Sequence, residues 1–145
     1  MKEVYSEIQI KASASVVWGI LTDFEKFGEW NPFITEISGK LKEGSELRVF
    51  MEPPNSKGME FKPTLKKVET EKKIQWLGKV WIPKLFDGEH RWIINQIDDN
   101  TVLFIQKERF TGIFVPFFSK LLKNTKSGFK MMNQNLKQRS EEMMG

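Results

Sequence analysis

In residues 3–11, polar and apolar side chains alternate, and this two-residue repeat is typical of a half-buried strand. The pattern then becomes helical. Residues 13–21 start with serines that can cap a helix, and residues 24–30 form a second short segment that Asn31 and Pro32 end. The beginning of the chain therefore predicts one strand followed by two short helices.

The middle of the chain contains six short apolar segments separated by turn-forming residues. These segments are residues 34–37, 47–51, 59–68, 74–81, 90–97 and 102–110. Turn formers such as Ser38-Gly39, Pro53-Pro54 and Asp98-Asp99-Asn100 stand between them. Consecutive short strands joined in this way predict an antiparallel sheet.

After Gly112 the apolar positions follow a helical repeat, and Pro116 stands where the first turn of a helix tolerates proline. One stripe carries Phe118, Leu122, Thr125, Phe129, Met132, Leu136 and Met143. We expect a helix from about residue 115 to residue 143, roughly 40 Å long at the usual rise per residue. Its apolar stripe needs a partner, so we expect the sheet to curl around it.

The chain has 145 residues and a mass of 17.0 kDa, which predicts a single domain over residues 1–145. The proportions of hydrophobic and charged residues, 39% and 29%, are those of a globular protein. Twelve phenylalanines and five tryptophans accompany only one tyrosine. This aromatic content is high, and the rings either fill the core or line a cavity for an apolar ligand.

The residue types exclude several kinds of chemistry. The chain has no cysteine and a single histidine, His90, so we expect neither a metal site nor a catalytic cysteine. Neither glycine-rich phosphate-binding pattern occurs, and we expect no cofactor. The lack of cysteine, of a signal peptide and of a long apolar run predicts a cytoplasmic protein without a transmembrane segment.

The formal net charge of +4 comes from the C-terminal segment, which contains six basic and two acidic residues after position 112. The basic residues are Lys120, Lys123, Lys126, Lys130, Lys137 and Arg139. Without an aromatic-interleaved basic motif, they do not predict nucleic-acid binding. They are compatible with a solvated helix face or with transient contact at an anionic membrane surface.

Three stretches resemble a known superfamily. Residues 14–24 (ASVVWGILTDF) precede Trp30-Asn31-Pro32-Phe33, and residues 85–92 (LFDGEHRW) and 132–137 (MNQNLK) follow later. With the order of elements, they resemble the START-like, or helix-grip (SRPBCC), superfamily and its polyketide cyclase/dehydrase-like branch. The resemblance implies an α+β helix-grip fold: a curved antiparallel sheet of about seven strands around a long C-terminal helix, with two short helices after the first strand.

The last predicted hairpin allows its register to be derived. If residues 98–100 form the loop, the numbers of opposite residues add up to 198. The opposite pairs are Ile97–Thr101, Gln96–Val102, Ile94–Phe104, Trp92–Gln106 and His90–Glu108. Polar His90, Gln106 and Glu108 then point into an aromatic interior. Because unpaired burial is costly, they must satisfy one another, bind water or serve a ligand.

We expect the site to lie between the sheet and the C-terminal helix. The predicted ligand-binding residues are Trp76, Val80, His90, Trp92, Phe104, Gln106, Glu108, Phe110, Thr125, Phe129 and Met132. Gly78 shares the parity of Trp76 and would leave space, and Met59 and Phe61 are further candidates. Gly128, in the predicted helix, indicates either close packing or room for a guest.

Three functions follow from these observations. The first is binding of a small hydrophobic molecule, such as a lipid, a sterol-like molecule or an aromatic or polyketide-type metabolite. The second is a cyclase- or dehydratase-like enzyme with His90 and Glu108 as the catalytic candidates. The third, implied by the superfamily, is a protein-partner module of the Hsp90-activator type. The apolar loop at residues 81–86 is either a lid or a connection folded onto the sheet.

Overall fold

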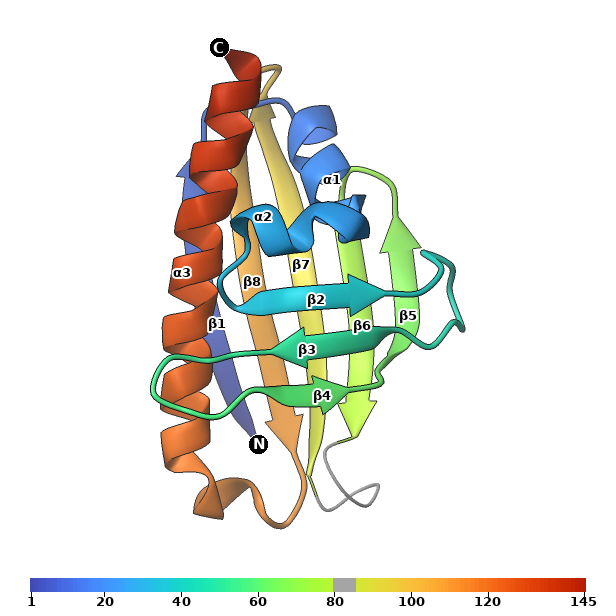
Figure 1. The fold of residues 1–145 in the computed structure, drawn as a ribbon, viewed down its shortest axis with the longest axis vertical. Coiled ribbons are helices and arrows are strands. Elements are labelled where there is room, and N and C mark those ends of the chain that lie inside the picture. Colours follow the sequence, from blue (N-terminus) through green and yellow to red (C-terminus); the bar gives the residue numbers. More distant parts are fainter. Residues whose placement is uncertain (80–85) are drawn as a thin grey trace.

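The computed structural model of the chain describes residues 1–79 and 86–145 (Figure 1). The strands are β1 (Lys2–Ile10), β2 (Ile34–Ser38), β3 (Arg48–Met51), β4 (Met59–Phe61), β5 (Thr64–Glu69), β6 (Lys73–Lys79), β7 (Asp87–Asp98) and β8 (Thr101–Thr111). The helices are α1 (Ala14–Thr22), α2 (Phe27–Trp30) and α3 (Ser119–Met144), with short 3-10 turns η1 (Phe24–Lys26) and η2 (Val115–Phe117). This is the α+β helix-grip architecture that the sequence predicts.

The strands form two antiparallel sheets. The larger has the order β1-β8-β7-β6-β5, and the smaller has the order β2-β3-β4. Strands of the smaller sheet run across those of the larger one (Figure 1). The sheets are joined beside β5, where the Leu47 amide donates to the Pro63 carbonyl and the Leu65 amide to the Ser45 carbonyl, each at 2.8 Å. Because the two sheets are joined beside β5 and cross each other, their facing surfaces can enclose a space away from that junction.

Polar side chains fix the beginning and the end of the short helices. The Ser13 hydroxyl accepts a hydrogen bond from the Val16 amide at 3.2 Å and caps α1. After α2, the Asn31 carboxamide oxygen accepts from the amides of Phe33 and Ile34 at 3.0 and 2.9 Å. Asn31 therefore turns the chain out of the helix and into β2.

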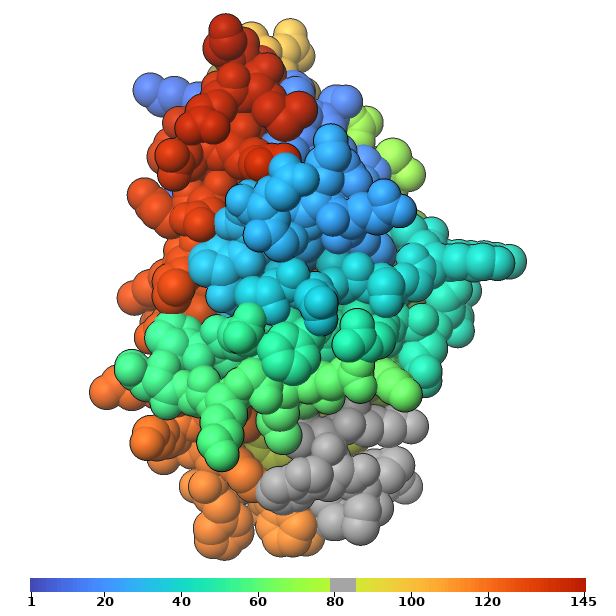
Figure 2. Space-filling view, in the orientation of Figure 1, coloured from blue at the N-terminus to red at the C-terminus, as the bar shows by residue number. Residues whose placement is uncertain are grey.

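Helix α3 packs the middle of its predicted stripe against the larger sheet, along β1 and β8 (Figure 1). The prediction is wrong at the ends, because Phe118 precedes the helix and Met143 is 63% exposed. Phe129, Met132 and Leu136 are fully buried. The helix starts later than predicted, because residues 115–117, which contain Pro116, form the 3-10 turn η2. On the face in Figure 2, α3 and the smaller sheet lie side by side. Among the described residues, no helix is both long and apolar enough to span a membrane.

The predicted register of the β7–β8 hairpin is confirmed over most of its length. His90 pairs with Glu108, and Trp92 pairs with Gln106. The prediction is wrong at the turn, because Asp98 pairs with Thr101 and belongs to the strand. The register shifts between Gln96 and Asp98, so Ile97 does not face Thr101. This irregularity compensates for the shorter loop and preserves the predicted pairs beyond it.

The predicted strand over residues 59–68 is two strands, β4 and β5, and each belongs to a different sheet. Pro63 lies at the break. Proline lacks the amide hydrogen that a continuous strand would use, and its ring restricts the residue before it. The chain changes direction there and leaves the smaller sheet for the larger one.

Candidate functional site

A hollow that is partly open to solvent lies between the two sheets and the first turns of α3. The larger sheet contributes Trp76, Gly78, Gly88, Glu108 and Phe110 to its wall. The opposite wall includes Phe33, Met51, Met59 and Phe61, and α3 adds Leu121 and Thr125. Phe86 lies at the wall and packs against Phe110, with ring centroids 5.6 Å apart. The surface of the cavity is therefore mainly apolar and aromatic.

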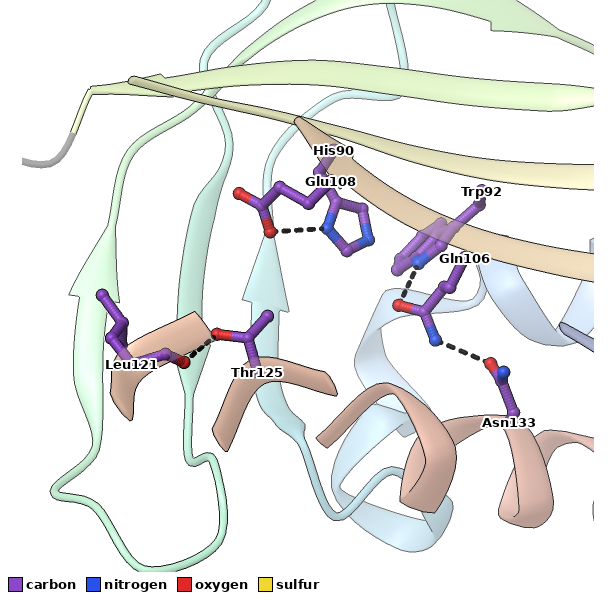
Figure 3. A network of polar contacts seen from close by, with 7 residues as sticks. All are labelled: His90, Trp92, Gln106, Glu108, Leu121, Thr125 and Asn133. Carbon is purple, nitrogen blue, oxygen red and sulfur yellow. Dashed lines mark hydrogen bonds and ion pairs between the residues drawn. The ribbon is translucent and has the colours of Figure 1, made fainter. Parts of the chain in front are cut away.

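Glu108 brings a carboxylate to this apolar wall. Its Oε1 lies 3.2 Å from His90 Nδ1 (Figure 3). The Glu108 side chain is 13% exposed, whereas that of His90 is 1% exposed. An ionised carboxylate only accepts hydrogen bonds, so with Glu108 ionised the proton of this contact is on His90 Nδ1.

The imidazole of His90 is enclosed by aromatic rings. It stacks on Trp76 with centroids 4.8 Å apart and an interplanar angle of 17°. The rings of Phe129 and Trp92 meet it edge-on, at 5.1 and 5.8 Å. His90 Nε2 is buried, and no other described residue forms a hydrogen bond with it. The ring thus has one partnered nitrogen and one without a partner in the described part of the protein.

Gly88 makes room for the Glu108 carboxylate. A Cβ atom at position 88 would lie 2.3 Å from Glu108 Oε2 and 3.4 Å from the Phe110 ring. Gly88 pairs with Gly78 on β6, where an added Cβ would meet nothing closer than 3.8 Å. Neither glycine has a positive φ, so both matter for the space that they leave rather than for backbone conformation.

A second polar group lies deeper between the larger sheet and α3. Trp92 Nε1 donates to Gln106 Oε1 at 3.0 Å, and Gln106 Nε2 donates to Asn133 Oδ1 at 2.8 Å (Figure 3). Asn133 Nδ2 then donates to Ser6 Oγ at 3.2 Å. We call Ser6, Trp92, Gln106 and Asn133 the anchor network. It connects β7, β8, α3 and β1 through buried atoms.

Thr125 is the polar residue of α3 at the cavity wall. Its hydroxyl donates to the Leu121 carbonyl at 2.8 Å (Figure 3). The hydrogen bond within the helix satisfies the donor and leaves the oxygen able to accept another bond.

The comparison with family models gives a match over residues 1–141 to the family described as polyketide cyclase / dehydrase and lipid transport. The chain belongs to this family. The resemblance predicted from residues 14–24 and 30–33 is therefore confirmed. A comparison with curated protein sequences finds no significant match.

Solved structures share the fold of this family member. A START superfamily protein from Mycobacterium smegmatis has 21% sequence identity and a TM-score of 0.73, with 97% of this chain and 98% of that chain covered. The Zhui aromatase/cyclase from a Streptomyces species has 11% identity and a TM-score of 0.77, with 99% and 96% covered. A point mutant of Thalictrum norcoclaurine synthase, bound to a transition state analogue, has 15% identity and a TM-score of 0.71, with 99% and 96% covered. At these identities the likeness concerns the fold.

The predicted site residues of this polyketide cyclase / dehydrase family member occupy two layers. Trp76, Glu108, Phe110 and Thr125 line the cavity. A buried layer contains His90, Trp92, Phe104, Gln106, Phe129 and Met132. Val80 and most of the loop predicted as a lid, residues 81–85, lie outside the described residues. From that loop, Phe86 is buried against Phe110 and Phe118.

Several wall residues were not predicted. Phe33 and Met51 come from elements whose position depends on how the smaller sheet crosses the larger one, which no local pattern gives. Gly88 had a usable signal, since the register places it opposite Phe110 and beside Glu108. For Gly128, close packing is the correct alternative, because a Cβ atom there would lie 2.3 Å from the Phe33 ring.

Residues 1–79 and 86–145 contain no cluster of three or more His, Cys, Asp or Glu side chains that could hold a metal ion. The polar groups at the cavity suit hydrogen bonding. Glu108 offers a carboxylate oxygen, Thr125 offers a hydroxyl oxygen, and the rings around them offer apolar surface.

Proposed function

We propose that the protein binds a small hydrophobic molecule in the cavity between its two sheets and α3. The observation that carries this proposal is a hollow with an apolar, aromatic wall and a carboxylate at one point. Small-molecule sites typically combine apolar walls with a few polar groups that fix the orientation of the ligand. The family description, which includes lipid transport, supports the same function.

Catalysis by His90 and Glu108 is the second candidate, and the His90–Glu108 contact at the cavity favours it. General acid–base catalysis needs a proton-transferring group within reach of the substrate. Glu108 lines the cavity, but His90 lies behind it, enclosed by Trp76 and Phe129. This burial gives binding the stronger support, with Glu108 as the group that contacts the ligand.

Filling the cavity tests the binding proposal. In Gly78→Leu, the new side chain starts where a Cβ atom has space and extends into the hollow. The neutral fluorescent probe N-phenyl-1-naphthylamine should bind the unmodified protein at one site, and Gly78→Leu should weaken it at least about tenfold. Native mass spectrometry of the freshly purified protein, with extraction of any bound molecule, would identify a natural ligand.

Gly19→Leu is the matched control, since Gly19 is exposed on α1 and a Cβ atom there would meet nothing within 4 Å. It should bind the probe like the unmodified protein. Equal, weak binding by all three proteins would contradict the proposal, because surface adsorption does not depend on the cavity.

A further inference from the structure

We propose that the natural occupant of the cavity carries a positively charged nitrogen, as an amine or a quaternary ammonium group, attached to an apolar body. Glu108 would bind the nitrogen, and the aromatic wall would surround it. This inference rests on the proposed function and specifies the class of ligand.

Charge at the described cavity wall is the first argument. Two charged residues line it, Glu108 and Lys57. Lys57 is exposed in the turn between β3 and β4, so water can solvate its ammonium group. Glu108 is largely buried against the floor of the larger sheet. The enclosed part of the site therefore contains a negative group.

The second argument is the unused acceptor capacity of Glu108. Its Oε1 contacts His90 Nδ1, and Oε2 points away from His90 (Figure 3). Within the described part of the chain, no hydrogen bond reaches Oε2. A carboxylate can accept about four hydrogen bonds, so a ligand that donates to Oε2 would complete its coordination.

The absence of a side chain at Gly88 allows Glu108 Oε2 to occupy its position. Oε2 occupies the space that a side chain at position 88 would fill, 2.3 Å from the location of a Cβ atom. With Gly88 and Gly78 facing each other, the floor next to the carboxylate is bare backbone. A ligand group can therefore approach the carboxylate from the cavity.

The third argument comes from the aromatic rings in the wall, which belong to Phe33, Phe61, Trp76, Phe86 and Phe110. The faces of aromatic rings carry partial negative charge and attract organic cations, most strongly where water is excluded. An anionic head group would instead meet the negative charge of the Glu108 carboxylate. The wall therefore selects against fatty acids.

Three probes of similar size and different charge test this inference: 4-phenylbutylamine, 4-phenylbutanol and 4-phenylbutyrate. Isothermal titration calorimetry with the full chain at pH 7 would measure each Kd. The amine should bind most tightly, the alcohol next and the carboxylate least, with about a tenfold difference or more between the amine and the carboxylate.

Glu108→Gln keeps the shape of the side chain and removes its charge. This variant should raise the Kd of the amine at least about tenfold and change the Kd of the alcohol by no more than about twofold. Glu7→Gln is the matched control, because Glu7 is exposed on β1, the neighbour of β8. This control should keep the preference for the amine.

A pair of glycine variants tests the position of the carboxylate. Gly88→Ala forces Glu108 Oε2 to move and should weaken the amine more than the alcohol. Gly78→Ala takes space from the cavity without contacting the carboxylate. It should raise the Kd values of all three probes to a similar extent. If Gly88→Ala does not fold, Glu108→Gln still decides the question.

The outcomes separate this inference from the proposed function. If the alcohol binds in the cavity and the amine binds no more tightly, the inference is overturned and the proposed function stands. If none of the probes binds, both the inference and the proposed function are overturned.

Discussion

The buried polar groups at the two ends of the interface between α3 and the larger sheet differ in how completely they are hydrogen-bonded. In the anchor network, the carboxamides of Gln106 and Asn133 each accept one hydrogen bond and donate another. At the cavity end, His90 and Glu108 share one contact, and among the described residues His90 Nε2 has no partner. The anchor network joins the helix to the sheet through satisfied hydrogen bonds, whereas the cavity end leaves hydrogen-bonding capacity unused among the described residues.

Other contacts of α3 follow the same division. In the C-terminal half of the helix, Asn135 donates to the Trp30 carbonyl at 2.9 Å, and Arg139 contacts Glu29 at 3.0 Å. Nearer the cavity, the hydroxyls of Thr125 and Ser127 donate to carbonyls of the helix itself. Hydrogen bonds and an ion pair to other elements therefore connect the C-terminal half of α3 to the rest of the protein, whereas the half at the cavity is held by apolar contacts.

Breaking the anchor network should give the largest loss of stability. Asn133→Leu would leave Gln106 Nε2 and Ser6 Oγ buried without their partner. Each buried unsatisfied group costs about 1–3 kcal/mol, so we expect a loss of about 2–4 kcal/mol in urea denaturation. A loss below about 1 kcal/mol would mean that the network does not anchor the helix.

Gly128→Ala should have the next largest effect, because its Cβ atom would lie 2.3 Å from the Phe33 ring. We expect a net loss of about 1–2 kcal/mol in thermal denaturation, since overpacking outweighs the gain in helix propensity. Gly19→Ala in α1 is the control: with nothing within 4 Å of the new atom, it should gain about 0.5–1 kcal/mol. Equal gains in the two variants would contradict the close packing of Gly128.

Glu108→Gln should cost less than about 1 kcal/mol of stability, because glutamine keeps an oxygen that can accept from His90 Nδ1. Urea denaturation would measure this loss: removing the charge of Glu108 should cost less stability than removing the hydrogen-bonding groups of Asn133. A loss as large as that of Asn133→Leu would make the two ends equivalent.

The smallest effect concerns Glu141, near the C-terminal end of α3. A hydrogen bond from Lys137 and another from the Lys11 amide hold the pKa of this carboxyl below its ordinary value of 4.5. The stabilisation is fully present above pH 4.5 and is lost as the pH falls through the pKa of the folded protein. Because the side chain is 31% exposed, we expect at most a few tenths of a kcal/mol.

The measurement is the difference in free energy of unfolding between the unmodified protein and Glu141→Gln, at pH 6 and at pH 3. The difference should shrink at the lower pH. A difference that stays constant would mean that Glu141 is not stabilised in its charged form.

The sequence predicted the features that depend on local periodicity. The position of the hairpin turn gave the pairing of His90 with Glu108, the two-residue repeat gave the face on which they lie, and the helical repeat identified the buried positions 129, 132 and 136 of α3. The irregularity at Ile97 was missed, because a loop of two residues with a bulge and a loop of three residues fit the same pattern. The crossing of the smaller sheet depends on long-range packing, so the contribution of Phe33 to the cavity could not be read from its neighbours.

The facing glycines on β6 and β7 also bear on how such a protein can diversify. Position 88 is tied to the carboxylate of Glu108, so a side chain there would disturb the polar group of the cavity. Position 78 has no such neighbour within 3.8 Å, and its backbone conformation suits any residue. Side chains of increasing size at position 78, starting with alanine, would therefore shorten the cavity step by step while the rest of the fold stays the same.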